Sequence, residues 1–178
     1  PRGNILGVVV SARDLTERIE IDKALKKSER SLAKAQQVAK VGHYEWDLNT
    51  NSTSWSIELY RIFGLDPLTY TPEANSFREL VHPEDVHLVS VENANQMVNI
   101  ENHELEFRVI DQSSGEIKYI HLWGESSFDK SGAPRYIFGI IQDITERVRA
   151  SEAIKESEEL HRITIETMPD PVFITDDD

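Results

Sequence analysis

The sequence repeats itself at domain scale, and this repeat constrains the fold more than any other feature of the chain. Residues 3–29 match residues 132–158 without a gap, at a constant offset of 129. Each copy runs from a turn glycine through an apolar strand into a helix, by way of Asp-Leu-Thr-Glu-Arg or Asp-Ile-Thr-Glu-Arg. The repeat therefore predicts that the chain holds the end of one domain followed by the whole of the next.

The Asp-x-Thr-Glu-Arg segments have the pattern of a helix start. Asp143 can accept hydrogen bonds from the free N–H groups of the first turn, and Glu146 can reach back to complete a capping box. We interpret Asp143, Thr145, Glu146 and Arg147 as the junction between the last strand and the helix that follows it. A purely structural cap explains the pattern, and a role in coupling the domain core to the helix is compatible with it.

Residues 15–40 contain neither Gly nor Pro and are rich in Glu, Lys, Ala and Leu, which predicts a helical linker. Steps of four and three residues define an apolar seam of the coiled-coil type, which could equally pack on its own domain. The seam consists of Ile21, Leu25, Ser28, Leu32, Ala35 and Ala39.

Between the two helices the period of the sequence changes to that of strands and turns. Strands are predicted at residues 43–48, 53–56, 104–110, 116–128 and 135–142, and a short helix at residues 58–64. Two strands, several short helices and a three-stranded meander indicate an α+β fold with an antiparallel sheet.

Residues 33–147 resemble a PAS domain of the fold-3 type with its C-terminal PAC motif. The resemblance is carried by AQQVAKVGHYEWDL (35–48), WSIELYRIFGLDP (55–67), VHPED (81–85), EFRVI (106–110), SGEIKYIH (114–121) and GIIQDITER (139–147). It implies a five-stranded antiparallel sheet with flanking short helices and the last strand in its centre. Long N- and C-terminal linker helices complete the expected fold.

The resemblance also implies a domain organisation and a role. Residues 1–14 are expected to be the C-terminal strand of a preceding PAS domain, 15–40 a helical linker, 41–147 the complete PAS/PAC domain, 148–166 a second helical linker and 167–178 the start of a following PAS domain. Such domains sense signals or relay them in two-component systems, for example in a sensor histidine kinase. The expected partners are a second copy of the chain, bound through the linker helices and the PAS surface, and the adjacent PAS and output domains.

Composition limits the partners and the compartment. The net charge of −13 argues against nucleic acid and against contact of this segment with an anionic membrane. The sequence has no apolar stretch of the length that a membrane span needs, so we expect a cytoplasmic segment. Without Cys, the chain has no disulfide, thiolate metal site or cysteine nucleophile.

Large apolar residues mark a candidate cavity, which either fills with its own side chains or admits a small molecule. The candidate lining residues are Trp46, Trp55, Tyr60, Met97, Phe107 and Ile140, with Phe63 and Leu65 beside them. A receptor for a small molecule or cofactor is therefore the alternative function, and an unidentified small ligand is left open.

No cofactor and no metal are expected. The resemblance assigns covalent flavin binding to PAS domains with a Cys, and haem binding to a His on the long helix before the third strand. His87 and His103 lie at the ends of that stretch, and His82 and His87 are five residues apart, which does not place them on one helical face. His161, with its weak likeness to a kinase phosphoacceptor, ranks last, so the segment is not expected to be an enzyme.

Overall fold

A five-stranded antiparallel sheet forms the centre of the molecule in the computed structural model, which describes residues 4–73, 76–89 and 102–167. The chain divides into two units, Pro1–Asp143 and Ile144–Asp178. The elements in chain order are α1 (Asn4–Ala39), β1 (Val41–Asp47), β2 (Ser52–Trp55), α2 (Ile57–Phe63), α3 (Ser76–Leu80), the 3-10 helix η1 (Val86–Val89), β3 (Asn102–Ile110), β4 (Ile117–Phe128), β5 (Pro134–Asp143) and α5 (Thr145–Thr167).

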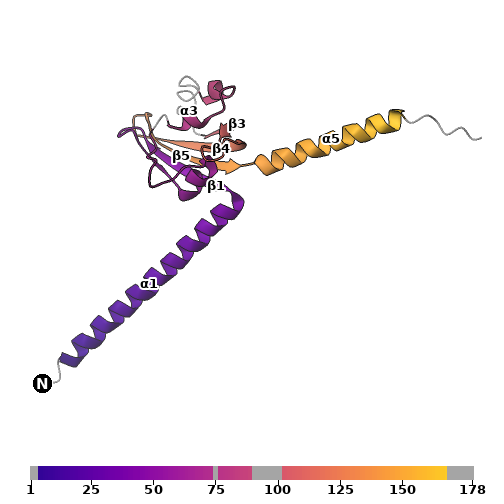
Figure 1. Ribbon diagram of the computed structural model, residues 1–178. Coiled ribbons are helices and arrows are strands. Elements are labelled where there is room, and N and C mark those ends of the chain that lie inside the picture. Colours follow the sequence, from indigo (N-terminus) through magenta and orange to yellow (C-terminus); the bar gives the residue numbers. More distant parts are fainter. Residues whose placement is uncertain (1–3, 74–75, 90–101, 168–178) are drawn as a thin grey trace, which may run out of the picture. The chain divides into compact units, whose positions relative to one another are not determined.

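The strands are arranged in the order β2-β1-β5-β4-β3, so the last strand lies in the centre (Figure 1). β5 pairs with β1 on one side, from Val41–Gln142 to Asp47–Tyr136, and with β4 on the other. The predicted strands, their antiparallel pairing and the central position of β5 are confirmed. The fold class is therefore the expected α+β fold with long helices at both ends of the sheet domain.

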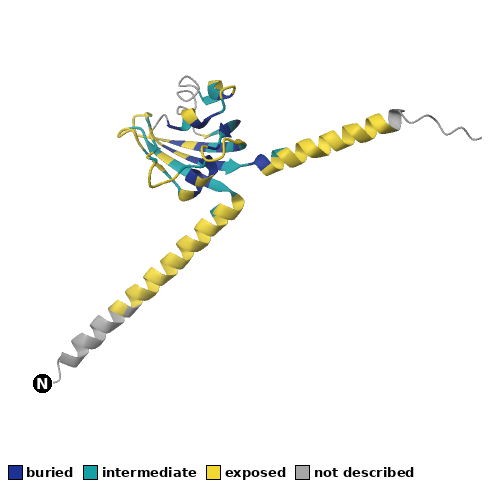
Figure 2. Cartoon of the chain, in the orientation of Figure 1, coloured by how far each residue is buried: buried dark blue, intermediate teal, exposed yellow. Residues whose placement is uncertain are grey.

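Alternation along the strands gives the sheet two different faces. On the inner face, Phe107, Val109, Ile120 and Ile141 are buried and join the hydrophobic core. The other members of this core come from the helices and the segment after α3, namely Leu59, Ile62, Phe63, Leu80 and Val81, with Leu122 from β4. Figure 1 shows α3 over this side of the sheet, and Figure 2 shows buried residues concentrated in the sheet domain.

A buried ion pair joins the short helix α2 to the β3–β4 hairpin. Lys118 Nζ lies 2.5 Å from Asp111 Oδ2, and the same ammonium donates to the carbonyl oxygen of Ile62 at 2.6 Å. Ile62 lies in the last turn of α2, where carbonyl groups lack partners within the helix. The lysine therefore neutralises Asp111 and caps α2 at the same time.

Asp111 is 5% exposed and also organises the turn after β3. Its Oδ1 accepts hydrogen bonds from Ser113 N at 2.8 Å and from Ser114 N at 3.0 Å. Burial opposes the charged form, but Lys118 and the serine donors outweigh it and lower the pKa of Asp111. Gly64 ends α2 with φ of 67°, and a Cβ there would overlap the Asp111 carboxylate, so two requirements fix glycine at this position.

A second buried carboxylate fixes the segment before β3. Asp85 accepts hydrogen bonds from Arg108 at Nε, NH2 and the backbone N, at 2.9, 2.7 and 2.8 Å. Glu84 adds a more exposed contact to the same guanidinium at 2.8 Å. Residues 83–85 form a turn, and the following 3-10 helix begins at Val86.

The N-terminal region differs from the expectation of a strand within residues 1–14. The structure has a helix from Asn4 onward. A helix satisfies its own backbone hydrogen bonds, whereas a strand needs a neighbour. Residues 5–14 are the repeat equivalent of β5. In the described sheet, β5 itself occupies the place between β1 and β4, so the helix is the structure that satisfies the backbone hydrogen bonds of the N-terminal residues.

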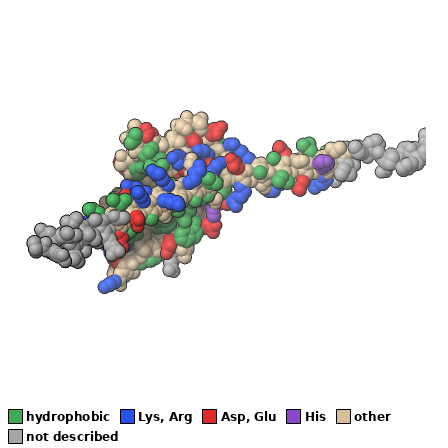
Figure 3. All heavy atoms as spheres, turned by 90° about the horizontal axis from the view of Figure 1, so that it is seen from below, with side chains coloured by type: hydrophobic (Ala, Val, Ile, Leu, Met, Phe, Trp, Pro, Cys, Tyr) green, Lys and Arg blue, Asp and Glu red, His purple; other side chains and the backbone are tan. Residues whose placement is uncertain are grey.

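The two long helices expose most of their side chains. α1 runs to Ala39 and α5 from Thr145, and exposed residues cover the described parts of both helices in Figure 2. Side chains of every class project from α5 in Figure 3. None of the described helices is both long and apolar enough to cross a membrane.

Replacing Lys118 by Met should lower the free energy of unfolding by about 3 kcal/mol, because it leaves the buried Asp111 carboxylate uncompensated. Denaturant unfolding measures this loss. The matched control is Lys26→Met, which removes a lysine from the exposed pair with Asp22 and should cost no more than about 0.5 kcal/mol. Equal losses of unfolding free energy for the two substitutions would show that the buried pair contributes no more than an exposed one.

The acid sensitivity of the domain should depend on Asp85. Its hydrogen bonds to Arg108 lower the pKa to about 2, below the ordinary value of about 3.9. The stability that this pair contributes is present above about pH 4 and is lost as the pH falls toward 2. Asp85→Asn should therefore flatten the fall in unfolding free energy over this range, although Asp111 still contributes to it.

The reciprocal substitution Arg108→Gln should flatten the same part of the pH profile, and the double variant should add little to either single one. A profile of Asp85→Asn that follows the parent protein down to pH 2 would contradict the assignment.

Candidate functional site

An aromatic cluster lies between the inner face of the sheet and the short helices. Trp55 contacts Tyr60 and Phe63 with ring centroids 5.6 and 5.4 Å apart, and Phe77 contacts Phe63 and Phe107 at 5.7 and 5.4 Å. The structure thus places Trp55, Tyr60 and Phe107 in one aromatic cluster. Whether they line a ligand cavity stays a prediction.

The other predicted lining residues have different positions. Trp46 lies on the inner face of β1, toward its end, and its indole donates to Asn51 Oδ1 at 3.2 Å. Ile140 lies on the outer face, because its neighbours Gly139 and Ile141 point inward and strand side chains alternate. Met97 lies outside the described residues.

Two paired glycines contribute no side chains to the centre of the inner face of the sheet. Gly124 of β4 pairs with Gly139 of β5. A Cβ on Gly124 would overlap the ring of His103, and a Cβ on Gly139 would overlap the ring of Tyr44. The imidazole and the phenol therefore lie over neighbouring stretches of sheet backbone, where only glycine leaves room for them.

Polar atoms without partners surround these glycines. His103 Nδ1 and Ser126 Oγ are buried and have no hydrogen-bond partner among the described residues, and Ser126 is 3% exposed. Ser126 and Gly124 are two residues apart on β4, so they face the same side. Burial lowers the pKa of His103, which favours the neutral imidazole, and raises the pKa of Tyr44 to about 12. The inner face thus presents a neutral imidazole and two hydroxyl groups, all able to donate or accept hydrogen bonds.

Sequence reasoning missed Tyr44 and Ser126, and it considered His103 only as a poorly placed haem ligand. The available signals were the glycines within strands β4 and β5, which mark a close approach of another group. Cross-strand register was also needed, since it alone shows that Gly124 and Gly139 are neighbours and that His103 pairs with Gly124.

The beginning and the end of the sheet domain are hydrogen-bonded to each other. The backbone N–H of Asp143 donates to the carbonyl of Lys40 at 3.0 Å, and Gln142 Nε2 donates to the carbonyl of Ala39 at 3.4 Å. Lys40 turns the chain from α1 into β1 with φ of 51°, a left-handed conformation that few residues other than glycine adopt.

The predicted signal junction comes next in the chain, directly after this contact. Asp143 is the last residue of β5 and α5 begins at Thr145, so Glu146 and Arg147 lie in its first turn. Ile144 and Thr145 are buried, with 5% and 7% exposure. The capping role of Asp143 stays a prediction.

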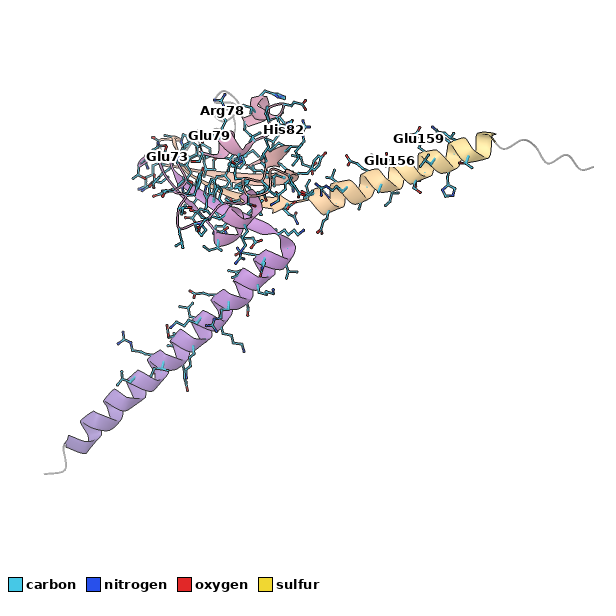
Figure 4. The ribbon with its side chains drawn as sticks, in the orientation of Figure 1. Glu73, Arg78, Glu79, His82, Glu156 and Glu159 are labelled. Atoms are coloured by element: carbon cyan, nitrogen blue, oxygen red, sulfur yellow. The ribbon has the colours of Figure 1, made fainter. Side chains whose placement is uncertain are left out.

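The candidate metal ligands have other partners. Asp85 binds Arg108, as described above. His82 Nδ1 accepts from the backbone N–H of Glu84 at 3.3 Å, and His87 Nδ1 lies 2.7 Å from the carbonyl of Glu84. His82 lies beside α3 in Figure 4. Within residues 4–73, 76–89 and 102–167, no group of three or more His, Asp or Glu side chains could hold a metal ion.

Comparisons with curated proteins give two kinds of relative. "Probable diguanylate cyclase DgcE" of Escherichia coli K12 is 22% identical over 174 residues, which are 98% of this chain and 16% of that protein. The "Blue-light-activated histidine kinase" of Brucella abortus is 26% identical over 158 residues, which are 84% of this chain and 31% of the kinase. The chain thus spans less than a third of the length of these relatives.

Solved structures agree with the sequence relatives. A sensory box histidine kinase/response regulator from Burkholderia thailandensis superimposes with a TM-score of 0.58 and 25% identity, covering 74% of this chain and 97% of that one. An RNA-binding light-oxygen-voltage receptor, with a TM-score of 0.55, 15% identity and coverage of 71% and 34%, shares the fold alone.

A family model described as the PAS fold matches residues 52–141, from β2 into β5. This range includes most of the sheet, the aromatic cluster and both inner-face glycines. The resemblance seen in the sequence is confirmed, and the relatives place the domain among sensor modules related to histidine kinases and diguanylate cyclases. The chain belongs to the PAS fold family.

Proposed function

We propose that this chain is a signal-relay module that acts as a homodimer and couples its sheet to a downstream output domain through the linker helices. The observation that carries the proposal is the hydrogen bond from Asp143 N to the carbonyl of Lys40. It joins the end of α1 to the end of β5, one residue before Ile144 and the start of α5. A change in β5 therefore acts on both linkers at once.

Stiff connections support the transmission of such a change. Neither residues 15–40 nor residues 145–167 contain Gly or Pro. β5 is central and paired along both edges, so it moves with the sheet rather than independently. Helices without flexible residues convert a small shift at their first turn into a displacement along their length.

Exposed apolar surface supports dimerisation. On α1, Ile21, Leu25 and Leu32 of the predicted seam are 63%, 55% and 61% exposed. On the outer face of the sheet, Tyr136 and Phe138 are 42% and 37% exposed. Both surfaces have the apolar character that a second copy of the chain would cover. The seam is short and contains Ser28 and two alanines, so a pairing through it is weak enough to have alternative states.

The parent protein, in this proposal, is a cytoplasmic multidomain regulator with tandem PAS domains. Residues 1–14 come from the end of a preceding domain, 41–147 form the complete one, and 167–178 begin the next. The output domain is of the histidine kinase type. Support comes from the domain-scale repeat and from the relatives, which are several times longer than this chain.

Insertions after Arg147 should change the output of the parent protein with a helical period. One added residue rotates everything beyond it by about 100°, and seven nearly restore the phase. Signalling activity should therefore be disturbed by one-, two- and three-residue insertions and recover with seven. If the short insertions leave activity unchanged, the helix is a passive tether.

A second candidate function is reception of a small molecule in the space over the inner face. The observation that favours it is a pair of buried polar atoms, His103 Nδ1 and Ser126 Oγ, for which residues 4–73, 76–89 and 102–167 offer no hydrogen-bond partner. A small molecule with both donor and acceptor groups would satisfy them and stack on the nearby aromatic rings. In this proposal, ligand binding would shift strands β4 and β5, which contain the glycine pair.

Ser126→Ala distinguishes an occupied site from an empty one. In ligand-free protein the substitution removes an unsatisfied buried hydroxyl and should leave the stability unchanged or raise it by about 1 kcal/mol. Native mass spectrometry of the unsubstituted chain should show a retained small molecule that the Ser126→Ala variant loses. The control is Ser127→Ala on the adjacent outward position, which should change neither quantity. A destabilised Ser126→Ala variant with no ligand in either protein would contradict the receptor role.

A further inference from the structure

The two linker helices carry opposite charges at equivalent positions of the repeat. At the offset of 129, Glu20 corresponds to Arg149, Lys23 to Glu152, Lys27 to Glu156 and Arg30 to Glu159. Other positions in the same stretch are kept, since Ala24, Lys26, Ser28 and Glu29 recur as Ala153, Lys155, Ser157 and Glu158. The reversal is therefore confined to one set of positions.

These positions share one face of each helix. Their spacing of three, four and three residues places them within an arc of about 80° on helical geometry. We call Lys23, Lys27, Arg30 and Lys34 the basic stripe of α1, and Glu152, Glu156 and Glu159 the acidic stripe of α5. All of these residues are exposed.

The surroundings of both stripes favour docking. The long side chains of the basic stripe lie on an open surface, with Lys26 and Ser31 beside them. Figure 4 labels Glu156 and Glu159 on α5. Glu159 has a weak contact of 3.2 Å with Arg162 on its own helix, in which both side chains are about two-thirds exposed, so it is available to a partner.

The basic stripe is separate from the apolar seam. On helical geometry the centres of the two lie about 140° apart around α1. A pairing of α1 with α1 through Ile21, Leu25 and Leu32 therefore leaves the basic stripe uncovered, and the two contacts can coexist.

We propose that the basic stripe of α1 binds the acidic stripe of α5 on a second copy of this chain, with the two helices parallel and aligned at the repeat offset. In this alignment all four reversed positions place opposite charges side by side, including Glu20 and Arg149, whose signs are inverted relative to the other three. An antiparallel alignment that keeps Lys27 beside Glu156 brings Lys34 beside Arg149, which is repulsive. Pairing either stripe with its own copy would also oppose like charges.

The contact joins two different surfaces, the basic stripe of one copy and the acidic stripe of the other, so the linker before the domain in one copy lies along the linker after the domain in the other. Each ion pair is exposed and individually weak, so the charge pattern selects the alignment more than it supplies affinity.

Cysteine cross-linking of the 178-residue chain tests the contact, because the sequence contains no Cys of its own. Lys34→Cys and Ile163→Cys introduce thiols at equivalent positions of the repeat, on the faces through which the two helices would pair. Copies with the two substitutions, carrying different tags, are mixed and oxidised. The mixed disulfide should exceed either homotypic one, and its yield should fall severalfold when salt rises from about 0.05 to 0.5 M, as the Debye length shortens.

Charge reversal then identifies the stripe. Arg30→Glu in the Lys34→Cys copy should lower the yield of the mixed disulfide about two- to fivefold, and Glu159→Arg in the Ile163→Cys copy should restore it. The matched control is Arg18→Glu, another exposed arginine of α1 about 160° away from the centre of the stripe, which should have no effect. Circular dichroism checks that each variant keeps its helices.

The proposal is overturned if the homotypic disulfides predominate, if Arg30→Glu has no effect, or if Arg18→Glu lowers the yield equally. It is also overturned if the stripe binds vesicles containing phosphatidylserine, or a single-stranded oligonucleotide, in an Arg30-dependent way while the mixed disulfide does not form.

Discussion

The contact of Lys118 with Asp111 and with the last turn of α2 fixes the geometry on which the rest of the domain depends. The ammonium group belongs to strand β4, and its two partners lie in the last turn of α2 and at the turn after β3, so this one group sets the position of α2 over the sheet. The aromatic cluster needs that position, since Phe63 lies one residue after Ile62 and packs against Trp55 and Phe77. The packing of the aromatic cluster over the inner face therefore depends on an electrostatic contact at its edge.

Much of this architecture is readable from the sequence, because it rests on local signals. Alternation and turn residues predicted the strands, and the repeat located the start of α5. What could not be read required knowledge of register or of neighbours. Ile140 and Ile141 are equally apolar, and only pairing shows which one faces inward. The apolar stretch after Asn4 has the composition of a strand, but its structure depends on whether another strand lies beside it.

The inner face combines features that destabilise a fold with features that could serve a function. Glycines in the middle of β4 and β5 contribute no side-chain packing, and buried polar atoms at His103 and Ser126 lack partners within the described part of the chain. The surrounding rings and the two buried carboxylate contacts, at Asp85 and Asp111, supply the compensating stability. Irregularities of this kind are typical of places where a protein binds or moves rather than merely packs.

The pairing of β1 with β5 also has a consequence for how the domain is made. These strands are neighbours in the sheet but nearly a hundred residues apart in the chain, from Tyr44 to Gly139 at the middle of the pairing. Closing so long a loop is entropically costly and slows folding. During synthesis, β1 cannot pair with β5 until the last strand has emerged from the ribosome. In an array of such domains, each one would be completed only as the helix leading to the next is being made.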